Sequence, residues 1–491
     1  MPKYIVTIGL EVHAQLNTKS KMFCTCAVGY GGEPNTQTCP VCLGLPGALP
    51  VLNLGAIEKT VLTGLMLNCR TPEISKWDRK NYFYPDMPKN YQTTQMDLPL
   101  CLGGGVPLYD FAYPKDAQKS IANPGKVVNL TRIHLEEDVG KSTHHDKFTT
   151  LDFNRAGTPL MEIVSEPELD SAEEVVAYLN SLRQILIYGG VGDADMEKGQ
   201  MRADVNISVR PEGQKELGTK IELKNINSMS AIRRAIKAET ERQIDVLEGR
   251  HPTDRVLIQS TRRWDDDLGE TTLMRSKEDA HDYRYFPCPD LIPVQTAPII
   301  ERMKPLRPEL PHEKCARFEA DFGLTPYDAN VLASEQALAS YFEQAVSAAP
   351  HVTGKKLANW IINELLGRLN EAGHGIADCT LPAGSLGELV ELVETGKISN
   401  NQGKEVFAEM YTNGGKAADI VKAKGFEQVS DTGALEAIVD QIIAGAAEKV
   451  AEVKGGNEKA LNWFTGQAMK LSGGKANPKL VTEIVRKKVL G

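Results

Sequence analysis

A carboxylate and an imidazole lie two residues apart near the start of the sequence and could hold a metal ion. Glu11 and His13 belong to the alternating segment YIVTIGLEVH, residues 4–13. Alternate residues of a strand share a face, so both side chains project from the side opposite the apolar one. Carboxylate and imidazole groups are suitable ligands for a divalent cation. The segment therefore predicts half of a metal site on a sheet.

A second, softer metal site is indicated by four cysteines that follow directly. Cys24, Cys26, Cys39 and Cys42 have the spacing C-x-C-x12-C-x-x-C. Two close pairs of thiolates can form a tetrahedral Zn²⁺ site, and this interpretation is favoured over four unrelated thiols. Because four sulfur ligands leave no position open for water, we expect this zinc to be structural.

Three later segments repeat the pattern of charged residues on one strand face. They are RIHLEEDVG, MRADVNISVR and TKIELKN, and we expect the last two to pair as antiparallel strands. If all four strands share a sheet, one face collects Glu11, His13, Glu136, Asp204 and Glu222, interleaved with Lys and Arg. Clustered carboxylates repel one another unless a cation lies among them, and such a set suits Mg²⁺ or Mn²⁺. The basic neighbours would face the phosphates of a bound nucleotide. A solvated polar sheet face is the alternative.

A segment rich in basic and aromatic residues spans 74–95, with the sequence ISKWDRKNYFYPDMPKNYQTTQ. Such a segment can hold phosphates and stack bases. A packed aromatic loop explains the same composition equally well.

The order of predicted elements indicates an α+β part followed by helices. Strands alternate with turns up to about residue 290, and a helix with a capping box at Ser171 and Glu174 intervenes. The proline-rich segment CPDLIPVQTAPII, residues 288–300, is interpreted as a linker. From about residue 303 the apolar spacing is helical, and a glycine-rich break at 413–415 opens a third part. We therefore expect domains at 1–292, 293–412 and 413–491.

Composition excludes several classes of protein. The net charge of −9 argues against a protein that coats nucleic acid along its whole length. Residues 401–491 contain 13 Lys+Arg and 11 Asp+Glu, a net of +2, which indicates either a solvated face or an RNA-contacting end. The sequence shows neither an apolar run of membrane-spanning length nor a signal peptide, so we expect a cytoplasmic protein without membrane contact. It also lacks the G-x-x-x-x-G-K-[ST], G-x-G-x-x-G and G-x-S-x-G motifs.

A series of long motifs along the whole chain resembles the B subunit of the tRNA-dependent aspartyl/glutamyl amidotransferase. In order, they are IGLEVHAQL, KMFC, LGLPGALPVLN, KWDRKNYFYPDMPKNYQ, RIHLEEDVGK, DFNRAGTPLMEIVSEP, MRADVNISV, IELKNINS, RYFPCPDL, NWIINELL, ISNNQGKEVFAEM and GQAMKLSGGKANPKLV. The resemblance implies an antiparallel-sheet cradle resembling glutamine synthetase, then an all-α helical domain and a small helical YqeY-like tail that contacts tRNA.

The resemblance also implies a reaction and its partners. ATP phosphorylates the side-chain carboxylate of Glu on tRNA(Gln) or of Asp on tRNA(Asn), and ammonia from an amidase partner then displaces phosphate. The implied partners are the amidase (the A subunit), a small C subunit and the misacylated tRNA. Two other interpretations stay open: a non-catalytic zinc-containing tRNA-binding scaffold, and a small-molecule ligase of the glutamine synthetase kind.

By the resemblance, the acidic face is the magnesium and catalytic site. Glu137 is an alternative to Glu136, because strand alternation alone chooses between them. Further candidates for contacts with ATP or with the acceptor end are Arg79, Lys80, Asn81, Lys220, Lys224 and Asn225. The four cysteines match a zinc knuckle at 24–42 that some members of the family have.

Overall fold

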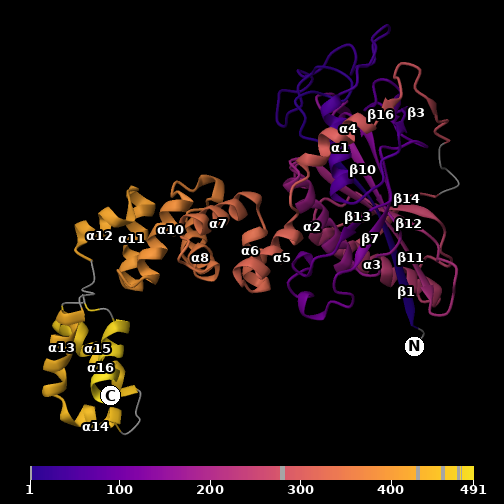
Figure 1. Cartoon of the computed structure of the whole chain (residues 1–491). Helices are drawn as coiled ribbons and strands as arrows, with labels where there is room; N and C mark the ends of the chain where they lie inside the picture. Colours follow the sequence, from indigo (N-terminus) through magenta and orange to yellow (C-terminus); the bar gives the residue numbers. More distant parts are fainter. Residues whose placement is uncertain are drawn as a thin grey trace. The chain divides into compact units, whose positions relative to one another are not determined.

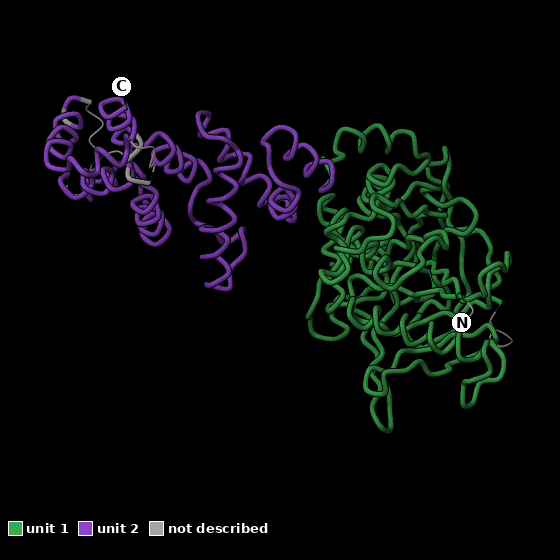
Figure 2. The backbone as a smooth tube through the Cα atoms, turned by 90° about the horizontal axis from the view of Figure 1, so that it is seen from below, with its two compact units in different colours: residues 1–310 green, residues 311–491 purple. Residues whose placement is uncertain are grey.

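The computed structural model describes residues 3–276, 282–426, 432–454, 459–472, 476 and 478–490. The chain divides into two compact units, residues 1–310 and 311–491 (Figure 2). The first unit contains all of the described strands, and the described elements of the second are all helices. The expected order of an α+β part followed by a helical part is therefore confirmed.

A nine-stranded sheet forms the centre of the first unit. Its strands, in spatial order, are β14 (Glu270–Ser276), β13 (Ser260–Asp265), β12 (Ile221–Lys224), β11 (Met201–Pro211), β1 (Tyr4–Gln15), β10 (Pro159–Ser165), β7 (Val127–Glu137) and β5 (Cys101–Leu102), with β6 (Gly105–Pro107) also on β7. The expected antiparallel pairing of β11 with β12 is confirmed. One pair, β12 with β13, is parallel, because the chain crosses between them through a helix.

One face of this sheet is covered by the helices α1 (Leu54–Met66), α2 (Ala172–Tyr188) and α3 (Met229–Leu247) (Figure 1). The alternation in β1 explains why: Ile8, Leu10 and Val12 are at most 1% exposed and share a core with side chains of the three helices. Burying these side chains stabilises the fold by about 1.5–3 kcal/mol each. The opposite face of β1 carries the polar residues.

The start of α2 differs in one detail from the capping box that the sequence predicts. The Ser171 hydroxyl accepts a hydrogen bond from the Glu174 backbone N–H, as expected. The Glu174 carboxylate bonds instead to the backbone N–H of Asp170 and to Lys126. A buried carboxylate gains more from a charged partner than from a second backbone N–H, which accounts for the change.

Three smaller sheets surround the large one. They are β15 (Phe286–Pro287) with β3 (Asp78–Asn81) and β4 (Tyr91–Thr94); β16 (Val294–Gln295) with β2 (Ile74–Ser75); and β8 (Lys141–His144) with β9 (Thr149–Asp152). The interpretation of residues 288–300 as a linker is wrong, because β16 pairs with β2 and α4 (Ala297–Met303) packs on α1. The first compact unit extends to residue 310.

The described elements of the second unit are helices. They are α5 (Pro311–Phe322), α6 (Pro326–Ala333), α7 (Gln336–Ala348), α8 (Gly354–Trp360), a π-helical turn (Ile361–Leu365), α9 (Leu366–Glu371), α10 (Ala383–Glu394), α11 (Asn400–Asn413), α12 (Ala417–Lys424), α13 (Thr432–Ala444), α14 (Ala447–Lys454), α15 (Lys459–Leu471) and α16 (Pro478–Leu490). Helix α11 ends at the predicted glycine break. Buried side chains of α13–α16, among them Phe464, form a core of their own. No described helix combines the length and hydropathy that a bilayer crossing requires.

The packing of α2 on the sheet yields a stability prediction. Leu179 is fully buried, whereas Ile187 on the same helix is 37% exposed. We expect Leu179→Ala to lower the free energy of unfolding by about 2–5 kcal/mol, because it leaves a cavity, and Ile187→Ala to lower it by less than about 1 kcal/mol. Urea unfolding of the full chain measures both. Equal losses would contradict this account of the core.

Candidate active site and cysteine cluster

The strand register gathers the predicted acidic residues on the open face of the sheet. Glu11 of β1 lies opposite Asp204 of β11, and His13 lies opposite Glu162 of β10. Asn206 of β11 lies opposite Glu222 of β12. Directly opposed residues of neighbouring strands point to the same side. The expectation that these strands share a sheet and a polar face therefore agrees with the pairing.

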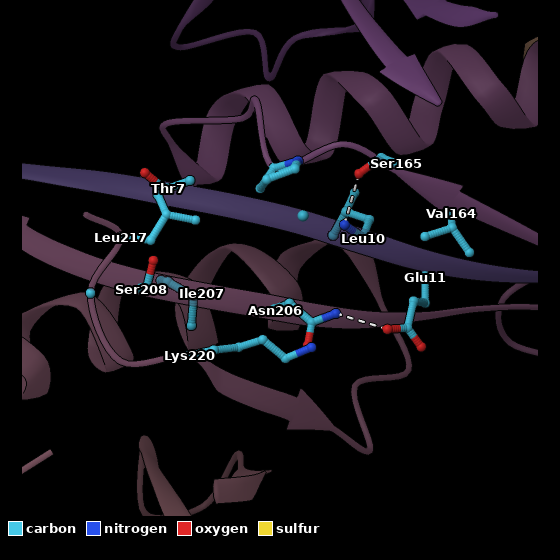
Figure 3. Close-up of a pocket in the computed structure, with 13 residues that line it drawn as sticks. Thr7, Leu10, Glu11, Val164, Ser165, Asn206, Ile207, Ser208, Leu217 and Lys220 are labelled. Atoms are coloured by element: carbon cyan, nitrogen blue, oxygen red, sulfur yellow. Dashed lines mark hydrogen bonds between the residues drawn. The ribbon is translucent and has the colours of Figure 1, made fainter. Parts of the chain in front are cut away.

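The first group of potential ligands consists of Glu11, Asp204 and Glu222, whose carboxylate oxygens lie within 4.8 Å of one another. The Lys224 Nζ donates to Asp204 Oδ2 at 2.5 Å and lies 3.0 Å from Glu222 Oε1. Asn206 Nδ2 donates to Glu11 Oε1 at 3.0 Å (Figure 3). Although burial acts in the opposite direction, Lys224 holds the pKa of Glu222 below its usual value. The Lys224 ammonium group thus partly neutralises the negative charge of these carboxylates.

The second group consists of His13, Glu136 and Glu162, again within 4.8 Å. His13 Nε2 lies 3.3 Å from Glu162 Oε2 and 3.8 Å from Glu136 Oε1. Although burial opposes it, the hydrogen bond to Glu162 raises the pKa of His13 to about 9. Burial and the charge of Glu162 raise the pKa of Glu136 to about 7. Two carboxylates so close together favour a bound cation.

Strand alternation predicts one shared site, whereas the structure separates the ligand atoms into two groups on the same face. Glu11 and His13 are two residues apart in an extended strand, which separates them by about 6.5–7 Å. Glu11 therefore groups with Asp204, directly opposite it, and with Glu222 of the adjacent row. His13 groups with Glu162, directly opposite it, and with Glu136 of the adjacent row.

Two residues of this face were missed at the sequence level. Glu162 is the single acid between apolar neighbours in PLMEIVS, residues 159–165, and it completes the second group. The sequence signal for Glu162 is no more than a lone acid in an otherwise apolar strand, because its neighbours on both sides are apolar. His134, only 4% exposed, lies 3.6 Å from Glu162 Oε2, and burial lowers the pKa of His134 to about 4.

The alternative ligand Glu137 lies apart from both groups. Its carboxylate pairs with Lys89 and accepts a hydrogen bond from the Thr93 backbone N–H at 3.0 Å. Because Glu137 follows Glu136 directly in β7, it points to the opposite side of the strand. The geometry therefore favours Glu136 as the ligand.

Of the six basic and amide residues predicted to contact ATP or the acceptor end, three lie at the polar face and three do not. Lys80, Lys220 and Lys224 lie at the polar face. Although burial acts in the opposite direction, the carboxylates of Glu136 and Glu162 raise the pKa of Lys80. Lys220 lines a pocket beside Glu11. Arg79, Asn81 and Asn225 do not join them in the described structure. Arg79 pairs with Asp290 at 2.5 Å and stacks on Tyr91. Asn81 donates hydrogen bonds to the backbone carbonyls of Tyr283 and Arg284. Asn225 is an exposed residue with φ of 62°.

The pocket beside the first group has a volume of about 250 Å³. It is lined by residues of β1, β11, the end of β10 and the segment 217–220, and Figure 3 shows the Lys220 side chain extending alongside Asn206. Thr7, Ser165 and Ser208 add hydroxyl groups, and Leu217 adds an apolar wall. Its mixed lining next to carboxylates is typical of a site for a small polar ligand.

The four cysteines form a third group of potential metal ligands, which offers sulfur atoms in place of oxygen and nitrogen. Their sulfur atoms lie within 4.8 Å of one another. The Cys39 backbone N–H donates to Cys42 Sγ at 3.1 Å, and Lys21, which is fully buried, places Nζ 3.6 Å from the same sulfur. A hydrogen bond from Cys24 lowers the pKa of Cys42 to about 4. The group is therefore suited to binding a metal through thiolates.

Comparison with known proteins identifies the family. A family model described as GatB/GatE catalytic domain matches residues 6–300, and one described as GatB domain matches residues 340–489. The aspartyl/glutamyl-tRNA(Asn/Gln) amidotransferase B subunit of Methylacidiphilum infernorum is 49% identical over 99% of this chain and 98% of its own length. That of Syntrophotalea carbinolica is 46% identical over 100% of this chain and 99% of its own, and that of Persephonella marina is 47% identical over 98% of both. The chain belongs to the B-subunit family of the aspartyl/glutamyl-tRNA(Asn/Gln) amidotransferases.

Proposed function

We propose that the protein is the ATP-dependent activating subunit of an amidotransferase that forms Gln-tRNA(Gln), Asn-tRNA(Asn) or both. The observation that carries the proposal is the pair of acidic groups on the open face of the sheet, with lysines beside them. Carboxylates interleaved with lysines suit a metal-bound polyphosphate better than they suit nucleic acid alone. This favours a catalytic subunit over a tRNA-binding scaffold.

The reaction requires activation because a carboxylate has no good leaving group. A side-chain oxygen of the aminoacyl group attacks the γ-phosphorus of ATP, and the bond to the β-γ bridging oxygen breaks to release ADP. Ammonia then forms the C–N bond as the C–O bond to phosphate breaks, and the proton that nitrogen loses ends on the released phosphate. Lys80 and Lys224 supply positive charge beside the two acidic groups, where phosphate charge would gather.

The donor atoms fit a divalent cation. Glu11, Asp204 and Glu222 would form one oxygen-only site, and His13, Glu136 and Glu162 would form a second site with one nitrogen. A bound Mg²⁺ would neutralise phosphate charge and polarise the phosphoryl group. In the described part of the chain, side chains such as Lys224 engage some of the carboxylate oxygens of the first site and leave others for a cation.

The cysteine group fits a structural Zn²⁺. Four thiolates complete a tetrahedral shell, and the backbone N–H bond and Lys21 would offset the charge of the sulfurs. The zinc would hold the segment 24–42 beside residues 153–157, where the Lys21 Nζ also donates to the Phe153 carbonyl at 3.2 Å.

The remaining parts of the proposal concern the fold and the partners. The first unit would be a cradle resembling glutamine synthetase, and residues 413–491 would form a YqeY-like tail that contacts tRNA. Ammonia would come from the amidase, the A subunit, and a small C subunit would complete the assembly. Requirement for tRNA distinguishes this proposal from a ligase that acts on free glutamate.

The first test removes the oxygen-only group. In the assembly with its partner subunits, we expect Glu11→Ala with Asp204→Ala to abolish tRNA-dependent ATP hydrolysis, because two of three cation ligands are lost, while tRNA binding remains measurable. Filter binding and ADP release measure the two quantities. Unchanged ATP turnover would refute the site, and amidated product from the wild type would eliminate the scaffold interpretation.

The second test compares neighbouring carboxylates on opposite sides of β7. We expect Glu136→Gln to weaken Mn²⁺ binding, measured by electron paramagnetic resonance, by at least about tenfold. Glu137→Gln is the matched control: it should leave Mn²⁺ binding unchanged and lower stability by about 3–5 kcal/mol, because Lys89 loses its buried partner. The reverse pattern would assign the ligand to Glu137.

The third test concerns the cysteines. We expect protein purified without chelator to contain zinc, and Cys39→Ser with Cys42→Ser to abolish zinc binding and lower the melting temperature, since metal binding is linked to folding. Atomic emission analysis and thermal unfolding provide the measurements. Wild-type protein without zinc would contradict the assignment.

A further inference from the structure

Arg202 lies between the two acidic groups and is a ligand in neither. In the register of β1 with β11 it stands opposite His13, and it precedes Asp204 by two residues on the same face. Its row continues across the sheet through His13 and Glu162 to His134. Its side chain is 38% exposed on this open face. The positive charge of Arg202 therefore lies on the same strand as Asp204 of the first group and directly opposite His13 of the second.

Asp138 fixes the position of this arginine. The Arg202 Nη2 donates to Asp138 Oδ1 at 3.0 Å, and it is the only hydrogen bond that the guanidinium makes within the described residues. Asp138, 2% exposed, also accepts from Gln15 Nε2 at 2.7 Å, and Arg155 Nε lies 3.5 Å from its other side. Gln15 and Arg155 both lie at Oδ2, and Oδ1 also accepts from the Val139 backbone N–H at 2.9 Å, so each oxygen of the buried carboxylate has a partner besides Arg202. Arg202 is held at one nitrogen, and its remaining N–H groups are available to a ligand.

The surroundings of Arg202 are acidic on several sides. The carboxylates of Asp138, Glu136 and Asp204 all interact electrostatically with Arg202, and a guanidinium keeps its charge in proteins without their help. Glu136 belongs to the second group and Asp204 to the first. A ligand that engaged both groups through cations would meet Arg202 between them. A guanidinium offers planar, paired donors that match phosphate oxygens, which an ammonium group does not.

We propose that Arg202, oriented by Asp138, binds the terminal phosphoryl group of the nucleoside triphosphate as that group passes to the substrate carboxylate. This inference rests on the proposed function, and it adds a residue that the sequence analysis did not include. The role differs from that of Arg155, whose Nε lies near Asp138 but donates to the Val139 carbonyl, and whose Nη2 donates to the Gly140 carbonyl.

The test measures equilibrium binding of ATP and of ADP, each with Mg²⁺, to the full chain in its assembly. We expect Arg202→Gln to weaken ATP about 10- to 100-fold, the effect of one lost charge-assisted contact, and to change ADP by less than about twofold. Arg202→Lys should recover only part of the loss, because it keeps the charge without the paired donors. Arg155→Gln, which also removes a partner of Asp138, should weaken neither nucleotide selectively.

The ratio of the two affinities within each variant separates function from folding. Equal weakening of ATP and ADP by Arg202→Gln would show a structural role and overturn the inference, as would unchanged binding of both. An Arg155→Gln variant with the same selective loss of ATP affinity would also overturn it, by assigning the effect to Asp138. Absence of ATP binding by the wild type would refute the proposed function itself, and this result is distinct from the others.

Discussion

The antiparallel pairing of β1 with β11 is the constraint on which the site depends. The register runs from Tyr4 opposite Pro211 to Ala14 opposite Met201, and it places Glu11 beside Asp204 and Arg202 beside His13. A shift by one residue would turn every one of these side chains to the other face and bring Ile8, Leu10 and Val12 into water. The apolar core under α2 and α3 therefore secures the positions of the polar residues above it.

The polar face holds carboxylates that repel one another in the absence of a ligand and that could bind a cation together. Glu136 and Glu162 are both largely buried, and their closeness disfavours two negative charges. His13 and Lys80 offset part of this repulsion, as Lys224 does for the first group. Side chains held in advance in this way need little rearrangement when a charged ligand binds, which is the general condition for electrostatic stabilisation of a transferring group.

Strand alternation was sufficient to predict much of this arrangement. It separated the apolar and polar faces of β1 and β11, and it favoured Glu136 over Glu137 before any contact was known. It did not identify Glu162, since a single acid in an otherwise apolar strand gives no pattern of its own. It also grouped five ligands together, because alternation assigns a residue to a face but does not give its position along that face.

Sequence by itself determined the identity and chemistry of the reacting groups, the two strand faces and the paired cysteines, because these depend on residue type and on spacing within one segment. Tertiary structure decided the contacts between segments that lie far apart in the chain. The pairing of 294–295 with 74–75, the salt bridge that turns Arg79 toward Asp290, and the meeting of Asp138 with Arg202 join residues far apart in the chain. Such contacts depend on loop closure and on packing of the whole unit, and no local pattern encodes them.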